Sequence, residues 1–451
     1  MNVRKKSFAI CGGAYGDEGK GRIVDMLVFD LAKKSPVVVY RDNGGANAGH
    51  TVEFANGERI AFHQLPSGVF VKGAVVVLGK EMVLHPGDLI DELNHITTVK
   101  ATTDRAKIKI DELAILALDT HRAYETVLKT WQSGSKGSTG RGISPAYADV
   151  LLRHPLRMRD IATFDKEKIA KHYDMYEALI AGLGQKLASI EVARLNGKPE
   201  AVGTKATFIK RLMAQAEKLA PITSDVHPWL AKNWADKKWG FVFEKAQAVG
   251  LDLRWGVYPD VTASDTTFDG IFSATEGIVD PDQLQVKAGV IKATYMSSVG
   301  SRVLPTLMDE PLANQIRQDA NEYGATTKRP RDIAYLDLPA LRFFVKVGRI
   351  SELMLTHMDI CYPNVPVKIC TGYKLGSKLV SYRPDQVFLS TVKPVYTEMD
   401  GWDVAKLSKA KKPADMPKEA RAFIKFMAKE IGVPITLITT GPKRKQSLRL
   451  A

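Results

Sequence analysis

Short apolar runs recur along the chain, and they are the main guide to its fold. Each run has the length of one strand, and several are followed by polar or glycine-containing turns. Runs of this kind are typical of strands covered on both faces, as in a parallel sheet whose functional residues gather at the strand ends. The strands predicted in this way are Ser7–Cys11, Val37–Tyr40, Ala74–Leu78, Phe241–Glu244, Leu353–Thr356 and Ile435–Thr439.

A long helical pattern interrupts this series of strands. The segment Asp160–Ala220 is rich in Ala, Leu, Lys and Glu, and its apolar residues recur with helical spacing. A chain of 451 residues can form one large domain or two to three smaller ones. The pattern therefore predicts an α/β protein with a large, mostly parallel central sheet and helical insertions.

The turn after the first predicted strand is suited to binding phosphate. It runs over Gly12–Arg22, combines glycines with carboxylates and Lys20, and leads into Ile23–Leu31, which has helical spacing. A glycine turn that opens onto a helix N-terminus presents free N–H groups to anions. A turn that merely joins strand and helix is the alternative, but the carboxylate–lysine pair inside the turn argues against it.

This turn differs from an ordinary P-loop. Ala14 stands where the first glycine of that pattern belongs, and Gly21 replaces the Ser or Thr that would hold magnesium. Asp17 is therefore a candidate metal ligand. The predicted fold accordingly contains a modified P-loop.

Two more loops offer groups that bind anions. The loop Asn43–Thr51 consists mostly of small residues around His50, which could protonate or polarise a phosphate oxygen, although a lone histidine is more often structural. The loop Gly137–Tyr147 offers hydroxyls, amides and the fork of Arg141. Three such loops predict two phosphorylated ligands.

The charge and the cysteines narrow the protein class. The 64 Lys and Arg residues exceed the 50 acidic ones, giving a net charge of +14, which suits anionic ligands and also nucleic acid. A nucleic-acid partner is the weaker reading because no binding module is recognised. Three scattered cysteines, with no apparent signal peptide and no membrane-spanning run, predict reduced thiols in the cytoplasm.

Eight motifs in a fixed order resemble those of one enzyme family. They are Gly16–Gly21, Asn47–Thr51, Ser138–Tyr147, Phe243–Gln247, Tyr258–Thr262, Asn321–Arg331, Thr356–Asp359 and Thr440–Pro442. In sequence and order they resemble the adenylosuccinate synthetase family, from Ser7 to about Arg444. The resemblance implies a single domain over residues 1–451, with a helical insertion at about 160–235 and a C-terminal guanine-pocket segment at about 350–451.

The resemblance also implies a reaction and its catalytic residues. Such enzymes join L-aspartate to C6 of IMP through a 6-phosphoryl intermediate, with GTP as co-substrate and one Mg²⁺ per active site, and they form homodimers. By resemblance, Asp17 removes the N1 proton and binds the metal together with the carbonyl of Gly49. His50 would steady the transferring phosphoryl group, and Lys20 would neutralise its charge.

The remaining site residues are implied in the same way. For the acceptor nucleotide they are Asn47, Thr139, Arg153, Gln247, Thr262, Val299 and Arg329, with Arg153 lent to the neighbouring subunit; from the local pattern alone, Arg153 could instead form a surface salt bridge. For aspartate they are Thr326, Thr327, Arg329 and Arg331. For GTP they are Gly16, Glu18, Gly19, Lys20, Gly21, Thr51, Arg331, Asp359, Thr440 and Gly441.

Several positions depart from the family pattern. His357, Lys328 and Asp332 replace a lysine, a glycine and an arginine beside the GTP and aspartate sites, and around the acceptor Lys245 replaces a glycine and Ser301–Val303 a glycine-containing run. IMP is the leading acceptor. The alternative is the same chemistry on dGMP, giving the 2-amino product of the phage diaminopurine pathway. A non-catalytic GTP-binding regulator is a third hypothesis, although it would need neither a base at Asp17 nor paired arginines.

Overall fold

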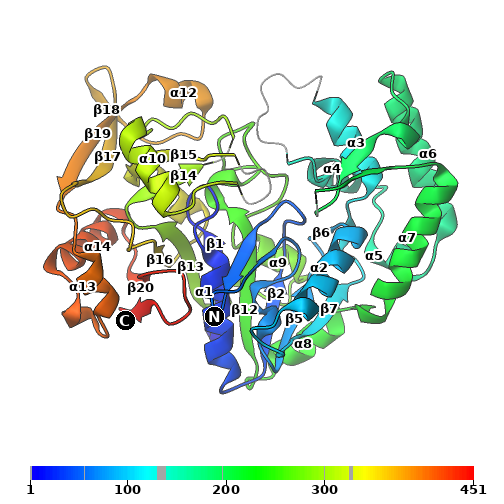
Figure 1. Cartoon of the computed structure of the whole chain (residues 1–451), viewed down its shortest axis with the longest axis horizontal. Coiled ribbons are helices and arrows are strands. Elements are labelled where there is room, and N and C mark those ends of the chain that lie inside the picture. Colours follow the sequence, from blue (N-terminus) through cyan, green and yellow to red (C-terminus); the bar gives the residue numbers. More distant parts are fainter. Residues whose placement is uncertain are drawn as a thin grey trace.

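A ten-stranded sheet forms the centre of the molecule in the computed structural model, which describes residues 3–54, 56–129, 139–195, 197–298, 300–324 and 329–450 (Figure 1). Every pairing in it is parallel except that of the last two strands. In spatial order the strands are β11 (Thr223–Ser224), β7 (Lys107–Asp111), β5 (Ala74–Leu78), β2 (Val37–Arg41), β12 (Gly240–Ala248), β1 (Arg4–Gly12), β13 (Leu284–Lys292), β16 (Glu352–Thr356), β20 (Ile435–Thr439) and β21 (Ser447–Arg449).

Both faces of this sheet are buried, which is why several of its strands have continuously apolar sequences. Along β1, Ala9 and Cys11 pack into one core cluster and Ile10 packs into another on the opposite face. The second face is covered by α1 (Lys20–Ala32), and the first by α8 (His227–Ala235), α9 (Gly270–Ala274), α11 (Leu338–Val347) and α14 (Lys418–Ile431). The predicted fold class, a large and mostly parallel sheet with helices, is confirmed.

All six predicted strands are present, but the sequence pattern missed others. The central strand β13 carries Lys287 and Lys292 within the sequence LQVKAGVIK, and β7 reads KIKID, so neither is a continuous apolar run. A second sheet contains both antiparallel and parallel pairings. Its strands are β14 (Tyr295–Ser298), β15 (Asp332–Asp337), β17 (Val367–Leu375), β18 (Lys378–Val380) and β19 (Lys393–Met399).

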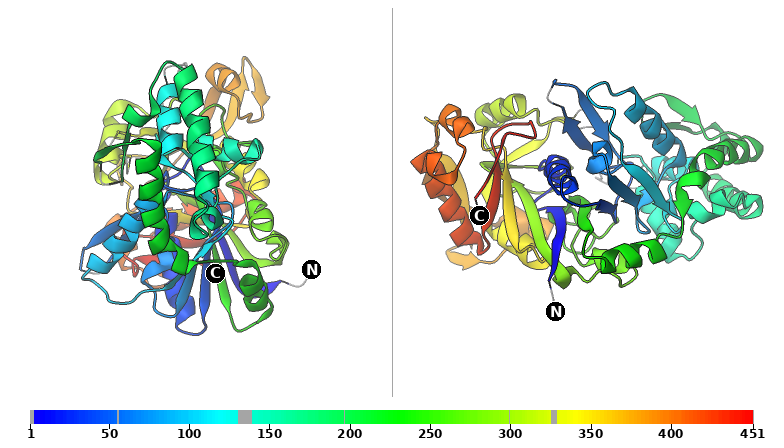
Figure 2. Two further views of the ribbon diagram at one scale, coloured as in Figure 1. Left: turned by 90° about the vertical axis from the view of Figure 1, so that its right-hand side faces the viewer. Right: turned by 90° about the horizontal axis from the view of Figure 1, so that it is seen from below.

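The helical region lies on the side of the molecule opposite the C-terminal helices (Figures 1 and 2). The predicted helical stretch Asp160–Ala220 is only partly helical, because a short hairpin of β9 (Glu191–Ala193) and β10 (Pro199–Ala201) separates its two long helices. The helices of the region are α3 (Asp119–Leu128), α4 (Ile143–Leu151), α5 (Met158–Ala162), α6 (Lys166–Gly182) and α7 (Lys205–Leu219).

The smaller elements complete the fold around these layers. They are β3 (His50–Glu53), β4 (Arg59–Phe62), β6 (Val83–Leu84), β8 (Ile115–Leu116), α2 (Pro86–Thr98), α10 (Glu310–Asp319), α12 (Gln386–Thr391) and α13 (Val404–Lys409). Among the described residues, no helix combines the length and apolar character needed to cross a membrane.

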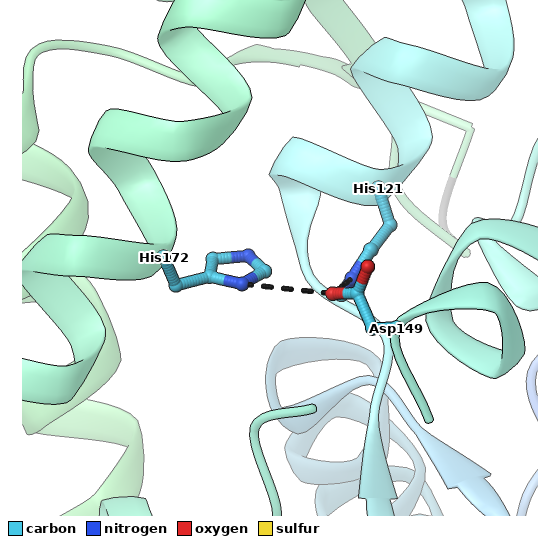
Figure 3. A group of neighbouring side chains, drawn as sticks. All are labelled: His121, Asp149 and His172. Carbon is cyan, nitrogen blue, oxygen red and sulfur yellow. Dashed lines mark hydrogen bonds and ion pairs between the residues drawn. The ribbon is translucent and has the colours of Figure 1, made fainter. Parts of the chain in front are cut away.

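A buried polar cluster joins three helices of the helical region, as Figure 3 shows. His121 Nε2 donates to an oxygen of Asp149 at 2.9 Å, and Nδ1 of His172 lies 3.8 Å from the same oxygen. The backbone N–H of Leu118 donates to His121 Nδ1 at 2.8 Å, so the ring carries its proton on Nε2. That proton occupies the lone pair that a metal would need, and the cluster is therefore a hydrogen-bonded joint between helices.

We expect this cluster to make the protein sensitive to acid. Burial, with the nearby His121 and His154, holds the pKa of His172 well below its ordinary value of 6.5. The unfolded chain therefore binds a proton that the folded chain refuses, and stability is lost as the pH falls below 6.5, by about 1.4 kcal/mol per pH unit for each such histidine. Replacing His172→Gln should reduce the loss of unfolding free energy between pH 7.5 and 5.5, measured by urea denaturation.

The exposed His227 provides the matched control for this prediction. His227→Gln should leave the pH dependence of stability as it is in the original protein, because that side chain is 44% exposed. A His172→Gln variant that loses stability as steeply as the original between the two pH values would contradict the prediction.

Candidate active site

The glycine loop after β1 packs too closely for other residues. A Cβ on Gly12 would lie 2.4 Å from an oxygen of Glu18 and 2.6 Å from the Cβ of Ala248 on β12. Gly19 has φ +85° where the loop becomes α1, in the left-handed region that favours glycine. The sequence thus forms a tight turn between β1 and α1, as predicted.

The carboxylate of Glu18 lies inside this loop and is held as an anion would be. Its Oε1 accepts hydrogen bonds from the N–H groups of Gly16 at 2.7 Å and Ala14 at 3.2 Å, and its Oε2 lies 3.0 Å from Lys20 Nζ. Glu18 is almost wholly buried. The loop amides and Lys20 therefore form a site that binds a negative group, which is the electrostatic requirement for a phosphate.

Asp17 and Arg331 are brought together from opposite parts of the sequence. Their side chains form an ion pair at 2.7 Å, and the Asp17 side chain is 36% exposed. Arg331 is itself held by Glu322 at 2.6 Å, and Glu322 also contacts the buried Lys292. Although burial acts in the opposite direction, the two cations hold the pKa of Glu322 well below its ordinary range, so this carboxylate stays charged.

His50 lies beside the start of α1. Its Nδ1 contacts the fully buried carboxylate of Glu244 on β12, and Ser67 Oγ donates to the same carboxylate at 2.6 Å. A Cβ on Gly21 would lie 2.8 Å from Ser67 Oγ and 3.2 Å from the His50 Cβ, so a side chain there would displace these neighbours. Burial lowers the pKa of His50 against the opposing effect of Glu244, and an incoming phosphate would favour the protonated ring.

Two residues of the predicted acceptor-nucleotide set are in contact: Gln247 on β12 and Asn47 in the loop between β2 and β3. Gln247 Nε2 donates to Asn47 Oδ1 at 3.3 Å, and Asn47 Oδ1 also accepts from the N–H of Gly45 at 3.2 Å. Gln247 Oε1 and Thr262 Oγ1 are buried with no hydrogen-bond partner in the described part of the chain. Buried polar atoms without partners are rare, and these two suit a bound ligand.

The predicted donor-base residues lie at the ends of two neighbouring strands. Asp359 follows β16 and Thr440–Gly441 follow β20, which pairs with β16 in parallel. Burial raises the pKa of Asp359, and Arg22 opposes that rise. Thr356 Oγ1 donates to the carbonyl of Glu18 at 2.6 Å, which ties this pocket to the glycine loop.

His357, at a position where the family has lysine, is a neutral group here. Its Nδ1 lies 3.0 Å from Thr356 Oγ1, and its ring meets that of Tyr295 edge to face. Burial, together with the positive charge of Lys292, lowers its pKa to about 4. The position therefore supplies no positive charge near pH 7.

The other predicted residues lie at the rim or outside the described residues. Thr51, Gly49, Thr139 and Arg329 are exposed, and Arg153 has φ +68° on an exposed turn after α4. Asp332 begins β15. Val299, Thr326, Thr327 and Lys328 fall outside the described residues.

Sequence reasoning missed the partners that hold the predicted side chains. Glu244, Ser67, Glu322 and Lys292 make the contacts described above but were not assigned roles. One signal was available for Glu244, because a carboxylate directly after three apolar residues of a buried strand requires a partner. No local pattern marks Ser67 or Lys292.

Fold and site together define a nucleotide-dependent enzyme with a modified P-loop at the carboxyl edge of a parallel sheet. The sequence profile of the adenylosuccinate synthetase family matches residues 9–448, and the chain belongs to that family. It is 34% identical over 448 residues to the adenylosuccinate synthetase of Halothermothrix orenii, covering 98% of this chain and 97% of the relative.

Two solved structures extend the comparison. The fully ligated adenylosuccinate synthetase of Plasmodium falciparum superposes with a TM-score of 0.85 at 28% identity, covering 99% of this chain and all of that one. Succinoaminodeoxyadenylate synthetase from cyanophage S-2L, solved with dGMP and dATP, has a TM-score of 0.57 at 15% identity, covering 99% of this chain and 96% of that one, and shares the fold alone. Family membership makes the chain a ligase that uses GTP as co-substrate and Mg²⁺ as cofactor.

The His50–Glu244 contact generates a prediction. Glu244→Gln keeps the shape of the side chain but removes the charge that fixes the proton on His50 Nδ1, so we expect kcat to fall roughly 10²-fold with little change in the KM for GTP. Steady-state phosphate release measures both. The control is Glu352→Gln, at the start of β16, where the carboxylate accepts a hydrogen bond from Thr436 Oγ1. Equal losses in both variants would contradict the prediction.

Proposed function

We propose that this protein condenses L-aspartate with C6 of IMP to give adenylosuccinate, with cleavage of GTP to GDP and phosphate. The main observation behind the proposal is the ion pair, 2.7 Å long, between Asp17 on the anion-binding glycine loop and Arg331 just before β15. A candidate base for a purine and a candidate clamp for a dicarboxylate thus stand together where a phosphate would bind. The family relatives support the same reaction.

The first step needs a proton acceptor at N1 of the purine. Asp17 would take the N1 proton, so that O6 becomes an oxyanion and attacks the γ-phosphorus of GTP; GDP leaves and 6-phosphoryl-IMP forms. The amine of aspartate then attacks C6 and phosphate departs with O6. The Asp17 carboxylate is 36% exposed and lies 2.7 Å from Arg331, which supports this role.

Positive groups would stabilise the transferring phosphoryl group. Lys20 would exchange its pairing with Glu18 for the phosphate, and His50, oriented by Glu244, would donate to a phosphoryl oxygen. The carboxylate of Asp17 and the carbonyl of Gly49 are hard oxygen donors that fit Mg²⁺, which commonly binds through one or two protein oxygens plus phosphates. Bound there, the metal would neutralise phosphate charge.

Specific groups would recognise the three substrates. Arg331 and Arg329, with Thr326 and Thr327, would bind the carboxylates of aspartate. Gln247, Asn47, Thr139, Thr262, Val299 and Arg329 would bind the acceptor nucleotide. Asp359, Thr440, Gly441, Thr51, Arg331 and the loop Gly16–Gly21 would bind GTP.

We also propose that the active sites of a homodimer share residues. Arg153 would reach the acceptor phosphate of the neighbouring subunit. It follows Leu151 and Leu152, which are 81% and 66% exposed, and two exposed leucines beside a strained arginine support a contact surface there.

The domain boundaries and location are proposals as well. The chain would act as one domain over residues 1–451, with its helical insertion at about 160–235 and its guanine-pocket segment at about 350–451. Three free, buried cysteines support a reducing cytoplasmic setting.

The alternatives are less well supported. The dGMP-specific reaction is favoured by the departures around the acceptor at Lys245 and Ser301–Val303, whereas the named relatives are adenylosuccinate synthetases over nearly the whole chain. A non-catalytic regulator has no use for the Asp17–Arg331 pair.

Turnover by the purified protein is the test of this function. With GTP, Mg²⁺ and L-aspartate, we expect phosphate release and a succinylated product, followed by mass, with IMP well ahead of GMP and dGMP. Asp17→Asn should lower kcat by ~10²-fold or more because the N1 proton has no acceptor. Selective turnover of dGMP would replace the proposal, and silence with all three acceptors would favour a regulator.

The identity of the donor nucleotide can be tested separately. A carboxylate at Asp359 can accept from both N1–H and the 2-amino group of guanine, whereas an amide cannot accept twice. Asp359→Asn should raise the KM for GTP by roughly 10²-fold and leave the KM for IMP within about twofold. Asp385→Asn is the control, because this carboxylate caps the start of α12 by accepting from the N–H of Phe388.

A further inference from the structure

Arg302 is a buried cation that touches three loops of the site. It is 5% exposed and follows Gly300 by two residues, in the run where the family has glycine. The centre of its guanidinium lies 4.9 Å from the ring centroid of Tyr15, and its Nη2 donates to the carbonyl of Asp260 at 2.7 Å. Its Nη1 contacts Ser298 Oγ.

Two of these contacts fall on segments next to residues assigned to the acceptor nucleotide, and the third falls beside the candidate base. Tyr15 lies in the glycine loop two residues before Asp17. Asp260 lies two residues before Thr262, and Ser298 directly precedes Val299 in the sequence; both Thr262 and Val299 belong to the predicted acceptor set. One guanidinium thus joins the loop of the candidate base, the loop of the acceptor residue Thr262 and the end of β14 at Ser298.

The backbone around Arg302 is fixed from a second side. The N–H of Ser301 donates to Asp260 Oδ1 at 3.2 Å, and a Cβ on Gly300 would lie 2.8 Å from the same oxygen. Gln386 Nε2 donates to Asp260 Oδ2 at 3.1 Å, while Gln386 Oε1 accepts from the N–H of Val303 at 2.7 Å. These hydrogen bonds tie the loop to Asp260, and the buried Arg302 donates to the carbonyl of the same residue.

Arginine suits this position for a geometric reason. A guanidinium can stack its face on an aromatic ring while its edge donates hydrogen bonds, and a lysine or a glycine cannot do both. Burial is costly for a cation and lowers the pKa of Arg302, so the side chain depends on these contacts being in place. A displacement of any one of these three segments would therefore alter the contacts of Arg302 with the other two.

We propose that Arg302 is a positioning residue that holds the loop of the candidate base Asp17 and the loop of the acceptor residue Thr262 in register. The inference rests on the proposed function. It predicts a selective effect, because Asp260 and Ser298 lie next to acceptor residues and Tyr15 lies beside the candidate base, whereas the donor-base residues Asp359 and Thr440 lie at the ends of other strands.

The test compares substrate constants in an Arg302→Met variant. Methionine keeps most of the volume and removes both the donors and the planar charge. We expect the KM for IMP to rise roughly 10-fold or more because the loops of Asp17 and Thr262 lose their alignment. The KM for GTP should stay within about twofold, and calorimetric titration with IMP alone should show the same weakening.

Arg4 provides a matched control at the far end of β1. It is 6% exposed, its guanidinium lies 4.6 Å from the centroid of Trp234, and it donates to the carbonyls of Asp236 and Trp239 at 3.0 and 2.9 Å. Arg4→Met should lower the melting temperature without changing the KM for IMP. A merely structural role for Arg302 would give the same result as this control.

Arg302→Lys keeps the test decisive if the methionine variant does not fold. Lysine retains the charge and one donor but not the stacked fork, so the KM for IMP should rise by an intermediate factor. The inference would be overturned if the KM for IMP were unchanged in the variants that fold, or if the KM values for IMP and GTP rose equally. Turnover by the wild-type protein would in that case still support the proposed function. A wild-type protein that neither binds nor converts IMP would overturn the proposed function and this inference with it.

Discussion

Buried charges that neutralise one another hold the carboxyl edge of the sheet together. Glu18 pairs with Lys20, Glu244 with His50, Lys245 with Asp42, and Lys292 with Glu322. A buried charge without its partner costs several kcal/mol, so each pair constrains the segments that carry it. The pairs therefore link β3 to β12, and β13 to the segment that carries Glu322, by electrostatic contacts in addition to the hydrogen bonds of the sheets.

The same arrangement explains how the site could respond to substrates. In the structure the Glu18 carboxylate accepts hydrogen bonds from the loop amides, and the Asp17 carboxylate pairs with Arg331. The protein's own carboxylates thus fill the positions proposed for a phosphate and a dicarboxylate. Substrates would exchange these contacts for equivalent ones instead of creating buried charges anew. Exchange of partners keeps the charges compensated at each stage.

Arg302 and Lys245 show how a family site can change away from its catalytic residues. Both are buried cations at positions where the family has glycine or a glycine-containing run, and both have acquired partners, Asp260 and Asp42 respectively. The catalytic candidates Asp17, Lys20 and His50 keep the family residues.

The strands with continuous apolar runs, such as Val37–Arg41 and Ala74–Leu78, were predictable because burial on both faces leaves a local record in the sequence. The glycine loop was predictable for a similar reason, since tight backbone geometry admits few residues. The strand β13 and the hairpin within the helical region were not, because lysines interrupt the first and the second is only three residues per strand.

By itself the sequence determined the α/β class, the modified P-loop, the order of the family motifs and the candidates Asp17, Lys20 and His50. Only the tertiary structure decided which side chains meet: Arg331 with Asp17, Glu244 with His50, and Arg302 with Tyr15 and Asp260. The physical reason is that residue identity and spacing control local backbone geometry, whereas pairing between distant segments depends on strand order and register in the folded sheet.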